Sequence, residues 1–281
     1  MEIKQEAQEE QQKLEMMRHS LSHVLAAAVK KHIPEAKLGI GPAIENGFYY
    51  DFDVPEPITD EQLKPLEKEM RKLIGRNMPF VRKELPLDEA RLLFDEAGEY
   101  LKVELIDDLA AEGQETVTVY ETGDFVDLCR GPHVNSTGEL PAKGFKLDRV
   151  AGAYWRGDEH NQMLSRVYGV AFEGREDLDA FLEQRAEAEK RDHRRLGREL
   201  DLFIISETVG KGLPILTPKG AAIRRVLERF IVDEELKRDY LHVYSSVLGR
   251  KELYKISGHW EHYQESMYPP INVDGEDYVL R

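Results

Sequence analysis

The stretch Leu14–Lys31, LEMMRHSLSHVLAAAVKK, decides how the first part of the chain folds. Its apolar residues recur at the i, i+3, i+4 spacing of an amphipathic helix, so we predict one helix over residues 5–31, ending before Pro34. His19 and His23 are four residues apart and therefore share one face of this helix. At about 100° per residue, that face lies roughly opposite the apolar stripe.

A second motif, Asp127-Leu-Cys-Arg-Gly-Pro-His133, stands much further along the chain. Its Gly-Pro pair predicts a loop, across which Cys129 and His133 can point at one site. With His19 and His23 they would supply four tetrahedral zinc ligands, or equally a polar pocket whose histidines position water. Taken separately, each motif also has a plain structural reading, since single histidines and a lone cysteine are commonly packing residues.

The chain around these motifs predicts a mixture of helices and strands. In the first half we expect strands within residues 37–53 with a turn at Asn46-Gly47, a helix over 59–77 with Thr59 and Gln62 as a capping box, a helix over 87–97, a strand at 116–119 and further strands within 142–172. In the second half we expect a highly charged helix over 175–202 that connects two domains, a strand at 213–216, a helix over 220–240 and a strand at 243–247.

Composition limits the class of protein. A length of 281 residues favours two domains, and no apolar run is long enough to span a membrane. The first fifteen residues lack the apolar core of a secretory signal, and Cys129 has no second cysteine to pair with, so we expect a cytoplasmic protein. The net charge of -15 argues against a general nucleic-acid coating protein. Any RNA contact would need a local patch, such as Lys30-Lys31 or the basic residues within 190–198, which are otherwise a solvated helix face.

Together the two motifs resemble the editing domain of threonine–tRNA ligases of the bacterial type, which is related to that of alanine–tRNA ligases. The resemblance continues through Ile40-Gly-Pro-Ala-Ile-Glu-Asn-Gly-Phe-Tyr-Tyr50 and Ala151-Gly-Ala-Tyr-Trp-Arg-Gly-Asp158. Lys190-Arg-Asp-His-Arg-Arg-Leu-Gly197 and Ser257-Gly-His-Trp260 resemble the linker helix and the entry to the catalytic domain. The resemblance covers essentially the whole chain.

This resemblance implies an α+β fold in two parts. Residues 1–172 would form the editing domain, with helices on an antiparallel sheet. Residues 173–202 would be the linker helix. Residues 203–281 would be the first part of a class II synthetase catalytic domain, a partial antiparallel sheet with helices that contains the first of three class motifs.

The resemblance also implies the residues of a deacylase site. His19, His23, Lys102, Cys129 and His133 would be catalytic, and Tyr50 and Asp127 would bind substrate. The site would hydrolyse serine wrongly attached to tRNA(Thr), and no metal is expected in it, although His19, His23, Cys129 and His133 are residue types that hold zinc. Without the resemblance, Lys102 would be an ordinary surface lysine.

The same resemblance implies that this chain is a fragment. The whole ligase attaches threonine to tRNA(Thr) with ATP, Mg²⁺ and a catalytic Zn²⁺, whose ligands would all lie beyond this chain, so we expect deacylase activity alone. Expected partners are the aminoacylated 3′ end of tRNA(Thr) and the serine and threonine moieties, without a membrane. The family forms homodimers through the first class motif, where this sequence has Ser246 in place of the usual proline, which puts the dimer contact in question.

Two other functions are compatible with the motifs. A free-standing editing hydrolase would carry the same pocket, but it would have no use for residues 201–281. A zinc-stabilised RNA-binding module would use His19 and Cys129 as ligands, and metal analysis of variants at these residues would separate it from the two enzymes.

Overall fold

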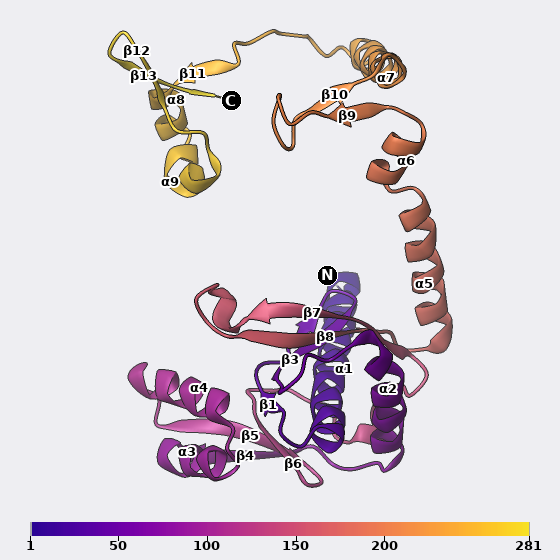
Figure 1. Cartoon of the computed structure of the whole chain (residues 1–281), viewed down its shortest axis with the longest axis vertical. Coiled ribbons are helices and arrows are strands. Elements are labelled where there is room, and N and C mark those ends of the chain that lie inside the picture. Colours follow the sequence, from indigo (N-terminus) through magenta and orange to yellow (C-terminus); the bar gives the residue numbers. More distant parts are fainter. Residues whose placement is uncertain (1, 281) are drawn as a thin grey trace. The chain divides into compact units, whose positions relative to one another are not determined.

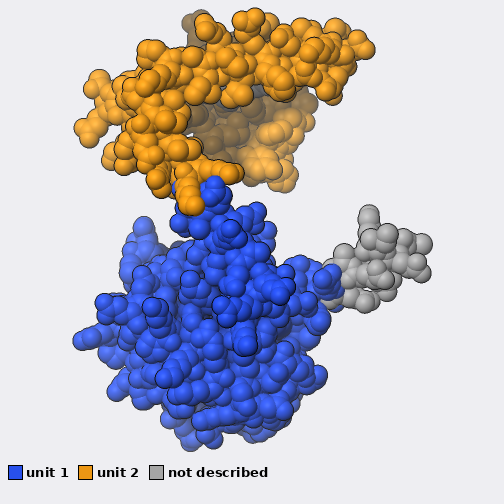
Figure 2. Space-filling model, turned by 90° about the vertical axis from the view of Figure 1, so that its right-hand side faces the viewer, with its two compact units in different colours: residues 1–189 blue, residues 190–281 orange. Residues whose placement is uncertain are grey.

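The computed structural model describes the backbone of residues 2–280 and the side chains of residue 8 and residues 10–280. The chain divides into two compact units, Met1–Glu189 and Lys190–Arg281, which are coloured separately in Figure 2.

Helix α1 spans Glu2–His32, which confirms the predicted helix. Leu21 and Leu25 on its apolar face are fully buried, as expected. On the histidine face, His23 is only 3% exposed, whereas His19 one turn earlier is partly buried. The middle of the helix, around residues 20–26, is therefore enclosed by other parts of the first unit.

One face of α1 packs on an antiparallel sheet (Figure 1). The sheet has the strand order β1-β3-β8-β7, and β2 pairs with the start of β3 on the same edge as β1, since β8 pairs with the other edge. Its strands are β1 Lys37–Leu38, β2 Ala43–Ile44, β3 Gly47–Asp53, β7 Phe145–Tyr154 and β8 Met163–Ala171. Alternate β3 residues Phe48, Tyr50 and Phe52 face α1 and are fully buried, because successive side chains of a strand point to opposite faces.

Helix α2, Asp60–Gly75, lies beside α1 and contacts β7. Its start confirms the predicted capping box, since the Thr59 backbone N–H donates to Gln62 Oε1 at 2.8 Å. The predicted turn is also confirmed, because Asn46 stands between paired strands β2 and β3.

A second antiparallel sheet, β4-β5-β6, forms a separate layer covered by helices α3 and α4. Its strands are β4 Val81–Pro86, β5 Thr116–Thr122 and β6 Phe125–Leu128, and its helices are α3 Leu87–Glu96 and α4 Tyr100–Ala111. The short helix η1, Thr137–Glu139, follows β6 in the chain. Helix α4 contains the segment 103–109, for which the sequence predicted no element type. Val103 and Ile106 of α4 pack with Phe94 and Val119 in this layer.

The hairpin between β7 and β8 packs on the outer side of α4. It contains the short helix η2, Trp155–Gly157. Trp155 packs with Leu101 and Leu164, and its Nε1 donates to Glu104 at 2.9 Å. The outer side of α4 is thereby held by a loop that comes from the main sheet.

The expected single helix over 175–202 is wrong in one respect, because it is broken. Helix α5 ends at Lys190 (Arg175–Lys190), and α6 spans His193–Glu199. Asp192 caps α6, since its side chain accepts from the Arg194 backbone N–H at 2.7 Å. Aspartate at an N-cap bonds the free N–H groups of a new helix, so the chain restarts there instead of continuing.

The second unit consists of short local elements. They are β9 Phe203–Ile205, β10 Pro214–Leu216, α7 Pro218–Leu236, β11 Leu248–Arg250, α8 Lys251–Ile256, α9 His259–Tyr263, η3 Gln264–Ser266, β12 Ile271–Val273 and β13 Glu276–Leu280. The predicted strand near 213–216 and the helix near 220–240 are confirmed. The predicted strand at 243–247 is wrong: Val243 and Tyr244 are exposed and no described strand pairs with them, so their β-branched and aromatic character alone forms no sheet.

The mixed fold of helices and antiparallel sheets confirms the α+β class at this level. The finer assignment of residues 1–172, 173–202 and 203–281 to named domains stays a prediction. Within the described residues, no helix has the length and apolar character that crossing a membrane requires.

Candidate functional site

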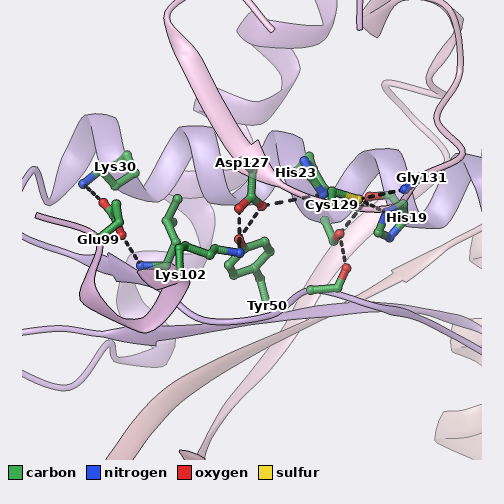
Figure 3. A network of polar contacts seen from close by, with 12 residues as sticks. His19, His23, Lys30, Tyr50, Glu99, Lys102, Asp127, Cys129 and Gly131 are labelled. Atoms are coloured by element: carbon green, nitrogen blue, oxygen red, sulfur yellow. Dashed lines mark hydrogen bonds and ion pairs between the residues drawn. The ribbon is translucent and has the colours of Figure 1, made fainter. Parts of the chain in front are cut away.

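Four elements and one loop of the first unit bring the seven predicted site residues together, and six of them, all but His133, are labelled in Figure 3. Helix α1 carries His19 and His23, strand β3 carries Tyr50, and helix α4 carries Lys102. Asp127 lies in strand β6, which ends at Leu128, and the loop after the strand carries Cys129 and His133. Residues that are far apart in sequence thus form one connected polar network.

The more accessible part of the network is a cluster of imidazoles around a thiol. His19 Nε2 lies 2.9 Å from Cys129 Sγ, and His133 Nε2 lies 3.3 Å from the same sulfur. The rings of His23 and His133 are 4.3 Å apart between centroids. The Gly131 backbone N–H donates to the sulfur at 3.2 Å, which fixes the loop around it.

Beneath this cluster lies a buried ion pair between Lys102 and Asp127, 2% and 1% exposed. Lys102 Nζ lies 2.6 Å from Asp127 Oδ1, although no hydrogen-bond donor is well aligned with that oxygen. Tyr50 donates to Asp127 Oδ2 at 2.5 Å and accepts from Lys102 at 3.2 Å. Removing one partner of such a pair costs about 3–5 kcal/mol, because a charge is left buried alone.

Burial determines the protonation of the site. It lowers the pKa of His19 below its usual 6.5, and it lowers the pKa of His23 further, with His19 and Lys102 nearby adding to the effect. Burial, followed by His23 and His19, lowers the pKa of His133 to about 2. Burial raises the pKa of the Cys129 thiol to about 12. Near neutral pH the imidazoles are therefore uncharged and the thiol is protonated, so His19 can accept a proton and Cys129 is no thiolate nucleophile.

Glycines make the close packing around the site possible. A Cβ at Gly41 would lie 2.1 Å from the Tyr50 ring, and the Gly41 backbone is itself a hydrogen-bond partner of His19. Gly131 has φ +70°, and a Cβ there would lie 2.3 Å from Tyr120 Oη. The positive φ and the lack of space both favour glycine at this turn.

Three residues of the site were not singled out from the sequence. Ser20 Oγ lies 3.1 Å from His133 Nδ1 and accepts from the Val134 backbone N–H, so it helps to orient that ring. Phe80 stacks on His133, with 5.0 Å between ring centroids, and Tyr120 packs against its edge. Ser20 lies inside the histidine motif, but Phe80 and Tyr120 carry no local signal, because only the tertiary fold brings them to His133.

The donor types of the imidazole–thiol cluster fit zinc. The ligand atoms of its four members, His19, His23, Cys129 and His133, all lie within 4.8 Å of one another. Two ligands of one tetrahedral zinc would be about 3.5 Å apart, from metal–ligand distances of about 2.0–2.3 Å. The 2.9 Å between His19 Nε2 and Cys129 Sγ is shorter and matches a direct hydrogen bond.

Two cavities lie near the network. One of about 450 Å³ is lined by Thr118, Cys129 and Arg130 and reaches the site. A larger one of about 660 Å³ lies further along α1, lined by Lys30, Phe94 and other residues, and it does not reach His19 or Cys129. Of these two cavities, only the smaller is lined by a residue of the predicted site, Cys129.

The two basic patches predicted as RNA contacts are engaged in ion pairs within the protein. Lys30 pairs with Glu99 at 2.7 Å, and Lys31 pairs with Glu69. In the second patch, Arg194 pairs with the neighbouring Asp192 at 2.8 Å. An RNA contact at either patch stays a prediction.

Comparison with known proteins identifies the class of domain. Residues 117–168 match the family model of the second additional domain of threonyl and alanyl tRNA synthetases. The matched segment runs from β5 into β8 and contains Asp127, Cys129 and His133.

Individual relatives narrow the assignment further than the family model does. The chain is 56% identical over 268 residues to threonine–tRNA ligase 1 of Bacillus subtilis (strain 168), and 54% identical over 268 residues to the threonine–tRNA ligase of Geobacillus sp. (strain WCH70). Each match covers 95% of this chain and 41% of the relative. The resemblance to threonine–tRNA ligases is therefore confirmed, and the chain spans about two fifths of the length of these relatives.

Proposed function

We propose that the first unit is an editing hydrolase that removes serine from mischarged tRNA(Thr), within a threonine–tRNA ligase. The observation that carries the proposal is the site itself, in which uncharged imidazoles and a thiol lie above a buried Lys102–Asp127 ion pair. The relatives, which are threonine–tRNA ligases, indicate the amino acid and the tRNA. We ascribe ATP-dependent attachment of threonine, with its Mg²⁺ and Zn²⁺, to the whole ligase.

A threonine–tRNA ligase needs a separate hydrolytic site because its amino-acid-binding pocket discriminates poorly between threonine and serine. A pocket that binds threonine gains only about 1–3 kcal/mol over serine, which lacks one methyl group. Serine is therefore attached too often. A separate pocket that accepts the seryl ester and excludes the threonyl ester removes the error by hydrolysis.

We assign the roles as follows. His19 holds and deprotonates the attacking water, because it is uncharged near neutral pH and more accessible than His23. Lys102 supplies positive charge beneath the reacting ester, held in place by Asp127 and Tyr50. His23, Cys129 and His133 shape the pocket and orient its polar groups, with the thiol as a hydrogen-bond partner of the ring nitrogens.

Single-turnover deacylation of seryl-tRNA(Thr) and threonyl-tRNA(Thr) tests the proposal. We expect the seryl ester to react faster, and His19→Ala to lower its rate by about 10²–10⁴-fold, the usual effect of losing a positioned acid–base group. His32→Ala is the matched control, since His32 is an exposed histidine at the end of the same helix. Equal rates for the two esters, or an unchanged rate in His19→Ala, would reject the proposal.

The metal expectation is tested in the same assay. Because the cluster atoms are close enough to bond one another directly, we expect EDTA to leave the seryl rate unchanged. Stoichiometric zinc that is lost in Cys129→Ala, together with loss of activity in EDTA, would show that the site works with a metal. The two other functions considered from the sequence gain no support from the comparisons, since the relatives named above are ligases.

A further inference from the structure

Glu99 is a buried carboxylate that no motif in the sequence marks. It stands immediately before α4, and its side chain is 5% exposed. Its Oε1 lies 2.7 Å from Lys30 Nζ, and its Oε2 accepts from the Leu38 backbone N–H at 2.7 Å. Figure 3 shows the Glu99 side chain with a dashed line to Lys30, near the Lys102 side chain.

The backbone of Glu99 is held as firmly as its side chain. Its N–H donates to the Phe94 carbonyl at 2.8 Å, where α3 ends. Its carbonyl accepts from the Lys102 N–H at 2.9 Å and from the Val103 N–H at 3.2 Å, which forms the first turn of α4. The position of Glu99 therefore determines where α4 begins and where the Lys102 backbone stands.

One side-chain partner of Glu99 lies on the helix that carries His19 and His23, and the other lies in the strand beside the one that carries Tyr50. Lys30 lies on α1 seven residues after His23, two turns along the helix on the same side. Leu38 lies in β1, which pairs with β3, the strand that carries Tyr50. One carboxylate thus connects the start of α4 to α1, which carries His19 and His23, and to β1, which pairs with the strand of Tyr50.

Lys30 is suited to hold this connection. Its ammonium also donates to the carbonyls of Pro34 and Ala36, at 3.3 Å and 3.0 Å. All three of its protons therefore have acceptors, so Lys30 has a defined position at the end of α1. At its other end α4 is held separately, by the bond from Trp155 to Glu104 and the ion pair between Arg156 and Asp108.

We propose that Glu99 is a positioning residue for the editing reaction: by tying the start of α4 to α1 and β1, it sets the place of Lys102 relative to Asp127, Tyr50 and the imidazoles. This inference rests on the proposed function of the site. Glu99 does not touch the reacting groups, and it acts through the position of α4. A displacement of about 1 Å in a catalytic group can lower a rate about 10²-fold, so a connection of this kind affects turnover.

The chain offers a matched control in Glu69. Its side chain is also 5% exposed, and it pairs with Lys31, the neighbour of Lys30 on α1, and with Lys72. Glu69 lies on α2, which carries no residue of the site. Neutralising Glu69 therefore removes a comparable buried anion beside the same helix without changing the anchor of α4.

The test compares Glu99→Gln with Glu69→Gln. Glutamine keeps the volume and an acceptor for Leu38, but it removes the negative charge that faces Lys30. In single-turnover deacylation of seryl-tRNA(Thr) we expect the rate at saturation to fall about 10–100-fold in Glu99→Gln, with a KM close to that of the wild type. The rate of Glu69→Gln is expected to stay within about 3-fold of the wild-type rate, even if both substitutions lower the free energy of unfolding measured in urea by similar amounts. Glu99→Asp, which retains the charge, should recover part of the rate.

A second comparison asks whether Glu99 acts through Lys102. In a Lys102→Met background, Glu99→Gln should cause no further loss of rate, because the group that it positions is gone. If Lys102→Met fails to fold, the variant Lys102→Met/Asp127→Asn, which removes both buried charges, serves as the background. A full 10–100-fold additional loss in that background would overturn the inference, as would a wild-type rate in Glu99→Gln or an equal loss in Glu69→Gln.

Amide hydrogen exchange tests the positioning role of Glu99 without any substrate. In Glu99→Gln we expect faster exchange of the Leu38, Lys102 and Val103 amides, which are bonded to Glu99, and no such change in Glu69→Gln. Unchanged exchange at all three amides would overturn the positioning role. If the wild-type chain left both esters intact, the proposed function would be rejected instead. The exchange result would still show whether Glu99 holds the start of α4 in place.

Discussion

The two units of the chain are built from similar elements but differ in how much apolar surface they bury. In residues 1–189 the helices and two sheets enclose a core that includes Leu21, Leu25, Phe48 and Tyr50. Beyond residue 189, Val279 is the only apolar side chain among the described residues that is buried. The comparison shows that helical and strand propensity form local elements, whereas burial requires partners from distant parts of the chain.

Helix α7 illustrates the difference. It has a capped start, since the Thr217 side chain accepts from the Gly220 backbone N–H, and Pro218 stands in its first turn. Yet Val226, Leu227 and Phe230 are all exposed. Its apolar residues mark a surface that favours association with other apolar groups.

The largest expected effect concerns amide exchange. The amides around Leu25 in α1 should exchange at least about 10³-fold more slowly than those around Leu227 in α7, because opening the core requires most of the global unfolding energy of about 5 kcal/mol or more. Hydrogen–deuterium exchange followed by mass spectrometry measures both regions in one sample. Similar protection of the two helices would contradict the contrast between the units.

A matched pair of core and surface leucines sharpens the comparison. Leu25 is 0% exposed and Leu227 is 61% exposed. Leu25→Ala should lower the free energy of unfolding of the first unit by about 2–5 kcal/mol, through lost burial and a cavity, whereas Leu227→Ala should change it by no more than about 0.5 kcal/mol. Urea denaturation followed by the fluorescence of buried Trp155, in a Trp260→Phe background, reports on the first unit. Equal effects of the two substitutions would show that the first unit lacks the packed core described above.

The smallest expected effect is the pH dependence of stability. The unfolded chain protonates His133 near its ordinary pKa of about 6.5, whereas the folded site, with a pKa of about 2, keeps the ring uncharged. The unfolded state therefore binds more protons in this window. Stability falls as pH drops below about 6.5, by up to about 1.4 kcal/mol per pH unit for this residue.

His133→Gln isolates this contribution. The variant should lose stability less steeply than the wild type between about pH 6 and pH 4, and the two curves should run parallel above about pH 7. His262→Gln, on exposed α9 in the second unit, should leave the slope unchanged. Urea denaturation at a series of pH values, with EDTA present throughout, measures the slopes. Identical slopes in His133→Gln and the wild type would mean that the ring is not held uncharged by burial.

Several parts of the molecule could be predicted from the sequence because short-range spacing determines them. The helix over residues 5–31, the capping box of Thr59 and Gln62 and the turn at Asn46-Gly47 all depend on residues a few positions apart. The break at Asp192 escaped prediction because a charged, Pro-free sequence continues through it. The strand expected at 243–247 was wrong because a strand needs a partner, which spacing along one segment does not supply.

In the candidate site, too, some features follow from local sequence spacing and others only from tertiary packing. The sequence by itself determined that His19 and His23 share a helix face and that a Gly-Pro loop presents Cys129 and His133, since both follow from local geometry. Only the tertiary structure decided that Lys102 is buried against Asp127 and that Glu99 ties its helix to α1. The physical reason is that burial and ion pairing depend on which distant elements pack together, so a lysine or glutamate of ordinary local context becomes part of the site only when the fold closes around it.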